Sequence, residues 1–457
     1  MSFMNWSYNG IVSSIHSDDT VKLPLISKDS TGALIPFHEF VNNFVPEFRD
    51  NSTFKLKRIL FNGALQNIYL TSCLSRFHDM YKVSYGRKLI KFETSDKYPH
   101  LTNGQTTADF VVKDDDFDNS EEIFKQNYEK NLPEGWPALH PRTRFLSDEE
   151  QKKLDNEWAE NDKPIVVVIH GLAGGSHEMQ IRAFADKLFN QEGFNIVVLN
   201  SRGCCRSKIS TPELFSALST EDIRFFINSL SEKFPEKLIH LISFSFGAAI
   251  VGNYLGEEGA NSKISSAVLL CCPWDLLDSS YHLDRSYTGS KIFGPAITSY
   301  LTNLVRVNLP LLEASNENKD IRKKYQIAKN FTKMIQFDSE FTAPMFGFLT
   351  ATDYYRKASP INRILKIQTP TLVLNSTDDP LISGNLPEAE CKANPYLILC
   401  KTNIGGHLAY VQSDDSLWYI DPITKFLKNM NKLLDHTKRP ESHYQPLHSK
   451  FDYKLNV

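Results

Sequence analysis

"KLIHLISFSFGAAIVG", residues 237–252, is the stretch that decides the fold. Residues 237–243 form a short, mostly apolar run that suits a strand buried on both faces of a parallel sheet. The residues at the other end have a helical pattern, so the tight turn between them falls on Ser245. Small residues stand two positions to either side, at Ser243 and Gly247, as a nucleophile elbow requires, although the first is more often glycine. This setting favours Ser245 as a nucleophile over an ordinary serine in a turn.

Runs of the same apolar, β-branched character recur along the chain. They occupy residues 164–171, 194–203, 266–273, 369–376 and 396–402. Helical patterns separate several of them; in 219–234 the apolar residues recur at helical spacing, and Ser219 and Asp222 are expected to cap the helix start. Strands that alternate with helices predict an α/β fold, with a mainly parallel central sheet flanked by helices.

The interval of about 276–360 breaks this rhythm, because it has no buried-strand run and a mostly helical pattern. We interpret it as a helical lid insertion at the carboxyl ends of the strands, where open α/β sheets bind ligands. A basic amphipathic helix is expected at 319–335, with an apolar face of Ile321, Tyr325, Ala328 and Ile335. Such a helix fits either a lid with a solvated face or attachment to an anionic membrane surface.

The rest of the chain divides into regions of different character. Residues 1–54 are interpreted as an irregular N-terminal extension, 55–435 as the α/β domain that carries the lid, and 436–457 as a polar C-terminal tail. Three strand-like runs are expected early in the domain, at 54–63, 65–74 and 86–96. The acidic segment 114–163 is interpreted as a surface connection rather than a metal site.

Composition narrows the functional classes. Of the 457 residues, 41% are hydrophobic and 23% charged, which allows a sizeable core, and the net charge of −3 gives no sign of nucleic-acid binding. The sequence shows neither a run long enough to span a bilayer nor a signal-peptide pattern. The seven cysteines lack a C-x-x-C motif and predict a reducing compartment. They are Cys73, Cys204, Cys205, Cys271, Cys272, Cys391 and Cys400.

A serine nucleophile needs a base and an acid that orients the base, in the order serine, acid, histidine for this fold. Asp378 and Asp379 follow one buried-strand run, and His407 follows the next, so both loops are expected at the same sheet edge as Ser245. We predict His407 as the base. Asp379, which is followed by Pro-Leu-Ile, is predicted as the acid, with Asp378 as the alternative or as a loop cap.

Two backbone N–H groups are expected to stabilise an oxyanion. One belongs to Phe246, directly after the nucleophile, and the other to Leu172, in the glycine-rich loop "HGLAGGSHE". The alternative interpretation of this loop is a flexible turn with no role in catalysis. His170 and Arg202 are interpreted as structural, Arg202 through a carboxylate or a helix cap. The two cysteines of "NSRGCCRS" are disfavoured as nucleophiles, because neither has the elbow.

In these residues the chain resembles the α/β-hydrolase superfamily, and within it the yeast medium-chain fatty acid ethyl ester synthase/esterases, YheT-like hydrolases and ABHD-type lipases. The resemblance rests on "HGLAGGSHE", "NSRGCCRS", "SFSFGAA", "NSTDDPLI" and "NIGGHLAYV", and covers about residues 55–430. It implies a Ser245–Asp379–His407 triad and an acyl-enzyme, with acyl-CoA or an acyl ester as donor and a short alcohol or water as acceptor. No metal or bound cofactor is expected.

The activity implied is that of a serine esterase and alcohol O-acyltransferase that makes fatty acid ethyl esters from medium-chain acyl-CoA and ethanol, with esterase or thioesterase hydrolysis beside it. The alternatives are a lipase or monoacylglycerol hydrolase on the same triad, and a non-catalytic hydrolase scaffold. The cysteines favour an intracellular, cytoplasmic-side location. The resemblance implies peripheral attachment to lipid droplets or the mitochondrial outer membrane.

Overall fold

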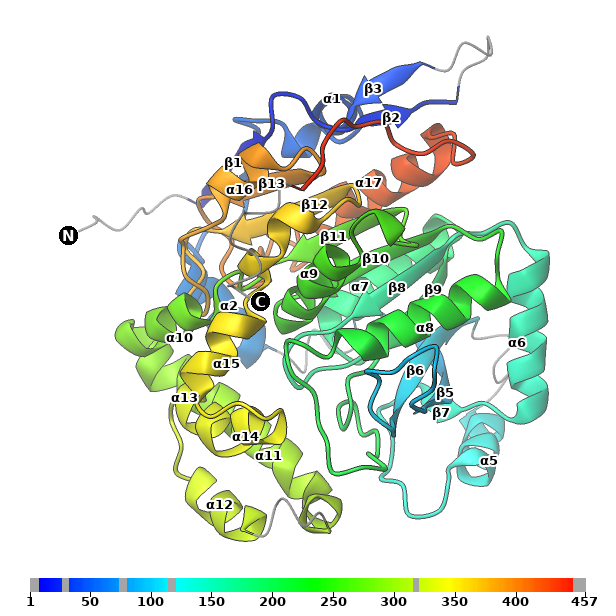
Figure 1. The fold of residues 1–457 in the computed structure, drawn as a ribbon, viewed down its shortest axis with the longest axis vertical. Coiled ribbons are helices and arrows are strands. Elements are labelled where there is room, and N and C mark those ends of the chain that lie inside the picture. The colour runs from blue at the N-terminus through cyan, green and yellow to red at the C-terminus, as the bar shows by residue number, and fades with distance from the viewer. Residues whose placement is uncertain (1–7, 27–32, 74–79, 114–120, 315–319, 447–457) are drawn as a thin grey trace. The chain divides into compact units, whose positions relative to one another are not determined.

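The chain folds into two compact units, each built from segments that are distant in sequence. Figure 1 labels the helices and strands of the chain. The computed structural model describes residues 8–26, 33–73, 80–113, 121–314 and 320–446. Unit 1 comprises Met1–Leu74, Phe244–Gly289 and Thr352–Val457, and unit 2 comprises Ser75–Ser243 and Ser290–Ala351. The two units are described in turn.

The strands of unit 1 run in the order β4-β1-β13-β12-β11. Their bounds are Thr53–Lys55 (β4), Asn9–His16 (β1), Leu397–Thr402 (β13), Thr371–Ser376 (β12) and Ser266–Leu270 (β11). The last three pair in parallel, whereas β1 is antiparallel to both neighbours. Every residue of β11 and β12 is buried, as expected for apolar strands with both faces covered. A separate hairpin joins β2 (Lys22–Pro24) to β3 (Leu34–Pro36).

The helices of unit 1 include one that is buried nearly all round. This is α9 (Phe246–Glu258), in which Gly247 to Gly256 are all buried. The others are α1 (Phe37–Phe44), α2 (Gly63–Ser72), α10 (Leu276–Arg285), α15 (Ala351–Ala358, whose first residue belongs to unit 2), α16 (Glu388–Ala393) and α17 (Ile420–Leu433).

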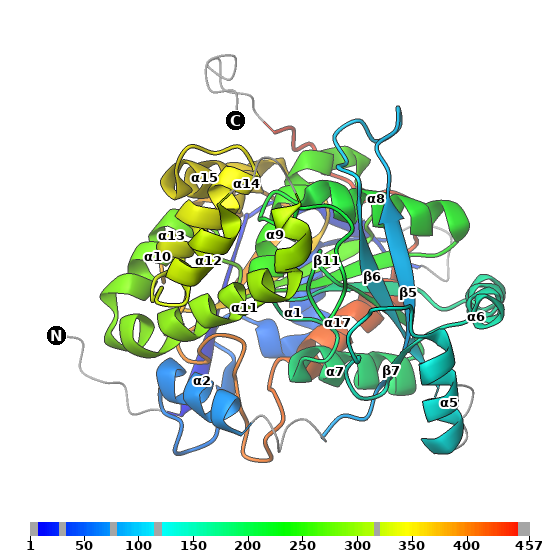
Figure 2. The same cartoon turned by 90° about the horizontal axis from the view of Figure 1, so that it is seen from below.

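The strands of unit 2 run in the order β10-β8-β9-β6-β5-β7. Their bounds are Ile239–Phe244 (β10), Ile165–Ile169 (β8), Asn195–Leu199 (β9), Gly104–Val112 (β6), Ser84–Phe92 (β5) and Thr143–Phe145 (β7). The apolar strands β8, β9 and β10 are parallel, and β6 is antiparallel to β9 and to β5. Figure 2 shows the long β5–β6 pair.

The helices of unit 2 begin with α5 (Glu121–Asn131), α6 (Asp148–Glu160), α7 (Met179–Asp186) and α8 (Thr220–Lys233). Those of the predicted insertion follow as α11 (Gly294–Glu313), α12 (Ile321–Ala328), α13 (Met334–Phe337) and α14 (Ala343–Met345). A capping box starts α6: Ser147 accepts the Glu150 N–H, and the Glu150 carboxylate accepts the Ser147 N–H. The expected cap of α8 by Ser219 and Asp222 is wrong, because Asp222 binds Arg202 instead.

Two predictions about the N-terminal third are wrong. Residues 1–54 are not irregular where described, since Val12 is fully buried in β1 and that strand pairs with β13. The described part of the expected strand at 65–74, residues 65–73, is not a strand, because helix α2 covers most of it, starting where the Asn62 side chain accepts the Leu65 N–H. The run at 86–96 does contain a strand, β5, whereas 54–63 holds only the end of β4.

The interval 276–360 is helical, as its pattern predicts, and its helices fall partly in each unit. The expected helix at 319–335 is shorter, ending at Ala328 with α12, and residues 315–319 lie outside the described part of the chain. Its predicted apolar face is buried at Ile321, Tyr325 and Ala328. No helix among the described residues is long and apolar enough to cross a membrane. The predicted polar tail is described only to residue 446. Within this part, Glu441 forms an antiparallel β-bridge with Lys22.

Candidate active site

Ser245 occupies the turn between β10 and α9 in a conformation that few side chains adopt. Its φ of 51° and ψ of −120° cost of order 1–3 kcal/mol for a residue other than glycine. The backbone holds it there, because its N–H donates to the Leu270 carbonyl at 2.8 Å and its carbonyl accepts the Ala248 N–H at 2.9 Å. Ser243 is fully buried and Gly247 is buried, so both small residues lie where the turn is closely packed. The turn therefore has the geometry of a nucleophile elbow.

His407 lies in the loop after β13 and contacts the candidate nucleophile directly. Its Nε2 is 2.7 Å from the Ser245 Oγ. The loop depends on Gly406, whose φ of +62° favours glycine and whose position leaves no room for a Cβ, which would stand 2.4 Å from the Asn67 Oδ1. His407 is 9% exposed, so its imidazole is largely shielded from water.

Asp379 completes a chain of three side chains within unit 1. Its Oδ2 is 2.8 Å from the His407 Nδ1, and its Oδ1 accepts the N–H groups of Leu381 at 2.8 Å and Ile382 at 3.1 Å. With the His407 proton on Nδ1, that nitrogen donates to Asp379 and leaves Nε2 free to accept the Ser245 hydroxyl. The three predicted residues are thus brought together in the order that base-assisted nucleophilic attack requires.

Asp378 has a different role from its neighbour. Its Oδ1 accepts the Ser376 hydroxyl at 2.6 Å and the Gly406 N–H at 2.9 Å, and burial raises the pKa of its carboxyl. Asp378 therefore links the loop after β12, which carries Asp379, to the loop after β13, which carries His407, without contacting the His407 ring. This matches the interpretation of Asp378 as a loop cap.

Helix α2 supplies two residues that sequence reasoning missed. Asn67 donates from Nδ2 to the His407 carbonyl at 2.7 Å, and its Oδ1 accepts the His407 N–H at 2.8 Å. Gln66 accepts the Val411 N–H at 2.8 Å, further along the same loop. Both amides are buried. Asn62, an N-cap residue, could have predicted the start of this helix. This signal is missed when the segment is interpreted as a strand.

Cys271 lies close to the Asp379 and His407 side chains. Its Sγ accepts the Leu408 N–H at 3.3 Å, and its thiol, the Asp379 carboxylate and the His407 ring offer atoms within 4.8 Å of one another. Burial raises the pKa of the thiol well above its usual value, so Cys271 is a neutral packing partner at neutral pH.

The two predicted oxyanion donors belong to different units. Phe246 is the first residue of α9 in unit 1, and Leu172 lies in a turn of unit 2 closed by a hydrogen bond from the Gly174 N–H to the Gly171 carbonyl. Each has the backbone setting expected of it. Their pairing in one oxyanion hole stays a prediction.

The two residues interpreted as structural have structural partners in unit 2. The Nε2 of His170 accepts the Ser201 N–H at 2.9 Å, so Nδ1 carries the proton and donates to the Gly171 carbonyl at 2.7 Å. Burial lowers the pKa of His170 to about 4, which keeps the ring neutral. Arg202 binds Asp222 with two nitrogens, at 2.8 and 2.7 Å, which confirms its expected pairing with a carboxylate.

Comparison with known proteins agrees with the fold. A family model described as the alpha/beta hydrolase fold matches residues 164–414. The chain belongs to this α/β-hydrolase family and is an enzyme of its acyl-ester class, as the sequence predicted.

Two proteins of Saccharomyces cerevisiae are similar over nearly the whole chain. "Medium-chain fatty acid ethyl ester synthase/esterase 2" is 39% identical over 94% of this chain and 97% of its own. "Monoacylglycerol lipase" is 34% identical over 91% of each. Human "Phospholipase ABHD3" is 26% identical over 63% of this chain and 72% of its own.

Proposed function

We propose that this enzyme transfers medium-chain fatty acyl groups from acyl-CoA to ethanol through Ser245, and hydrolyses the same thioesters and esters when water is the acceptor. The observation that carries the proposal is the chain of contacts from Ser245 through His407 to Asp379, at 2.7 and 2.8 Å. The similarity to the yeast ethyl ester synthase/esterase, which extends over almost all of both chains, supports this substrate class.

The mechanism follows from the roles of the three side chains. Ser245 attacks the acyl carbonyl while His407 accepts its proton, and Asp379 stabilises the imidazolium that forms. The Phe246 N–H, directly after the nucleophile, donates to the tetrahedral oxyanion, and His407 returns the proton to the leaving thiol or alcohol. A second alcohol or water, deprotonated by His407, then attacks the acyl-enzyme and releases an ester or an acid.

The choice between alcohol and water depends on how well the site excludes water during the acyl-enzyme stage. We assign this control to the helical insertion at 276–360. In unit 1, its helix α10 is linked to the acid loop, because the His282 Nε2 lies 3.2 Å from the Asp379 carbonyl oxygen and Asn385 donates to Asp278 at 3.0 Å. These contacts support a lid whose first helix is anchored beside the catalytic acid.

A monoacylglycerol lipase is the second candidate, because a protein of that name is 34% identical over 91% of both chains. It uses the same triad and differs only in the ester that reaches Ser245. Purified protein should be given medium-chain acyl-CoA with ethanol, and separately a monoacylglycerol. Higher kcat/KM for ethyl ester formation supports the first candidate, and higher kcat/KM for glycerol release supports the second.

Peripheral attachment to a lipid surface is part of the proposal. Among the described residues, half of the large apolar side chains that are exposed lie within 276–360: Tyr281, Tyr287, Ile292, Tyr300, Val307, Ile327 and Leu349. Exposed apolar side chains concentrated in one segment favour contact with lipid or another apolar surface. Flotation with neutral and with anionic vesicles tests the attachment, and protein that stays at the bottom of both gradients contradicts it.

A further inference from the structure

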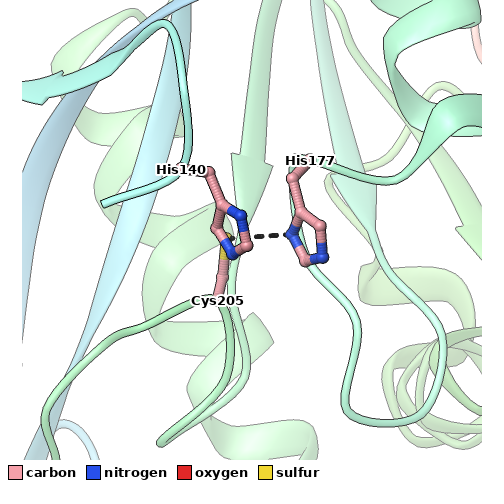
Figure 3. Close-up of side chains that lie close together, drawn as sticks. All are labelled: His140, His177 and Cys205. Atoms are coloured by element: carbon pink, nitrogen blue, oxygen red, sulfur yellow. Dashed lines mark hydrogen bonds between the residues drawn. The ribbon is translucent and has the colours of Figure 1, made fainter. Parts of the chain in front are cut away.

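Three residues that the proposed reaction does not use come together in unit 2 (Figure 3). His140 lies before β7, His177 lies before α7, and Cys205 lies in the loop after β9. Each offers a ligand atom, and these atoms lie within 4.8 Å of one another. Two imidazole nitrogens and a thiolate are a ligand set that zinc prefers.

The spacing of these atoms suits a single ion. The Cys205 Sγ is 3.6 Å from the His177 Nδ1. Tetrahedral zinc, with Zn–S of about 2.3 Å and Zn–N of about 2.0–2.1 Å, separates neighbouring sulfur and nitrogen ligands by about 3.6 Å. The His140 ring stacks on the His177 ring, with centroids 3.8 Å apart and planes 4° from parallel.

The histidines are in the state that metal binding requires. Burial, with the nearby His177 and Arg206, lowers the pKa of His140 to about 3, and burial also lowers the pKa of His177. Both rings are therefore neutral at neutral pH and can donate a lone pair to a metal. Among the described residues, none hydrogen-bonds the His140 ring nitrogens, so ligation by His140 costs no existing hydrogen bond.

Cys205 has a partner that stabilises a thiolate. The Arg87 Nη2 lies 3.3 Å from its Sγ, and the Arg87 Nη1 donates to the Cys205 carbonyl at 2.9 Å. Arg87 is fixed in turn by Asp109, through hydrogen bonds of 2.6 and 2.8 Å. Burial raises the pKa of the thiol, so zinc displaces its proton on binding. The guanidinium then offsets part of the thiolate charge, as partners around metal ligands commonly do.

The loop of His177 is tied to the same buried carboxylate. Ser176 donates to Asp109 at 2.6 Å, and Asn200, just after β9, donates to Asp109 at 2.9 Å. Gly175 allows the close approach of the two loops, because a Cβ there would stand 2.4 Å from the Cys205 Cβ. The ligands on these two loops are therefore positioned in advance rather than gathered by the metal.

We propose that His140, His177 and Cys205 form a zinc-binding site of unit 2, with three protein ligands and a fourth position open to water or a small ligand. Cys205 is buried and the two histidines are half-buried, so the open position lies on the histidine side. The ion would cross-link three loops that are distant in sequence and stabilise unit 2.

Titration of purified, chelator-treated protein with Zn²⁺, in competition with a chromophoric chelator, tests the site. The titration is made in a Ser245→Ala/His407→Asn background, because Cys271, Asp379 and His407 form a second group that is able to hold a metal. One equivalent of Zn²⁺ is expected to bind. Cys205→Ala and His177→Ala should each weaken binding by more than the roughly 10–100-fold that loss of a supporting partner costs. Cys204→Ala and His100→Ala, a buried and an exposed residue outside the cluster, should leave binding unchanged.

Co²⁺ in place of Zn²⁺ provides a readout that needs no change in the cluster. The proposal predicts a thiolate-to-cobalt charge-transfer band and the intense visible bands of tetrahedral Co²⁺ in the same background. Lack of stoichiometric uptake, a Co²⁺ spectrum without the thiolate band, or equal uptake by folded Cys205→Ala protein would overturn the proposal. Circular dichroism of each variant establishes that it is folded.

Discussion

Asp378 and Asp379 are adjacent in the sequence, yet their carboxylates have different partners. Only Asp379 contacts the His407 ring, and its second oxygen is fixed by two backbone N–H groups. Asp378 is occupied by Ser376 and by the Gly406 N–H. The pair therefore offers a matched comparison between an acid that orients the base and an acid that holds the loop.

Asp379→Asn is expected to lower kcat by about 10⁴-fold, because an amide donating to Nδ1 favours the wrong imidazole tautomer. Asp378→Asn keeps an oxygen that can accept the Gly406 N–H, and should change kcat by less than about tenfold. Steady-state kinetics of both variants, with thermal unfolding as the folding control, checks the difference. Equal losses in the two variants would contradict the assignment of the acid.

Helix α2 clamps the loop that carries the catalytic base His407, because two of its side chains hydrogen-bond the backbone of that loop. Asn67 satisfies both the N–H and the carbonyl of His407, and Gln66 holds Val411. A Cβ on Gly63 would stand 2.1 Å from the Asp378 carbonyl oxygen, so the start of the helix also packs closely on the acid loop. A helix from the first 75 residues thus positions a histidine more than 300 residues later in the sequence.

Asn67→Ala should lower kcat by about 10–100-fold, since each backbone group left unsatisfied in the interior costs roughly 1–3 kcal/mol and the loop is released. Asn62→Ala removes only the N-cap of the same helix. It should cost about 1 kcal/mol of stability and leave kcat nearly unchanged. Parallel measurement of kcat, KM and unfolding free energy separates the two. A loss of kcat in Asn62→Ala as large as that in Asn67→Ala would contradict a specific clamp.

The same elements show what the sequence can and cannot predict. The buried strands β8 to β13 can be predicted because each contains a mostly apolar run, and the triad residues lie in the turns or loops that follow three of these strands. Helix α2 cannot be predicted from an apolar pattern, because its buried side chains include the polar Gln66 and Asn67. The partners of these two side chains lie in the loop that carries His407. Strand β1 is missed because it alternates only weakly and is stabilised by pairing with the distant β13.

Across the whole molecule, some side-chain clusters are formed by segments far apart in the sequence, and no short sequence motif predicts them. The candidate zinc site joins residues of three loops, and no spacing in the sequence links His140 to Cys205. The same holds for the buried ion pair of Arg87 with Asp109, which comes from two neighbouring strands. Such clusters become visible only after the strands have been assigned their order.

Buried neutral histidines make stability depend on pH. Burial lowers the pKa of His170 from 6.5 to about 4, so the unfolded chain binds a proton that the folded chain excludes between these values. Stability from this group is fully present above pH 6.5 and is lost as the pH falls toward 4.

The unfolding free energy is therefore expected to fall by about 1.4 kcal/mol per pH unit for this histidine as the pH is lowered across that range. His170→Gln, which retains an acceptor for Ser201 and a donor for Gly171, should flatten the slope by about one proton. Exposed His100→Gln serves as control. Denaturant titrations at several pH values, with a chelator present, measure both slopes. An unchanged slope in His170→Gln contradicts a neutral buried imidazole.

The proposed reaction depends on Ser245 as the nucleophile. The most direct measurement is covalent labelling by a fluorophosphonate probe, followed by mass spectrometry of the labelled peptide and by assay of ester formation from acyl-CoA and ethanol. We expect one label on Ser245 and loss of both label and activity in Ser245→Ala, with both retained in Ser243→Gly. Full ester formation and hydrolysis by Ser245→Ala, or a label on another residue, would contradict it.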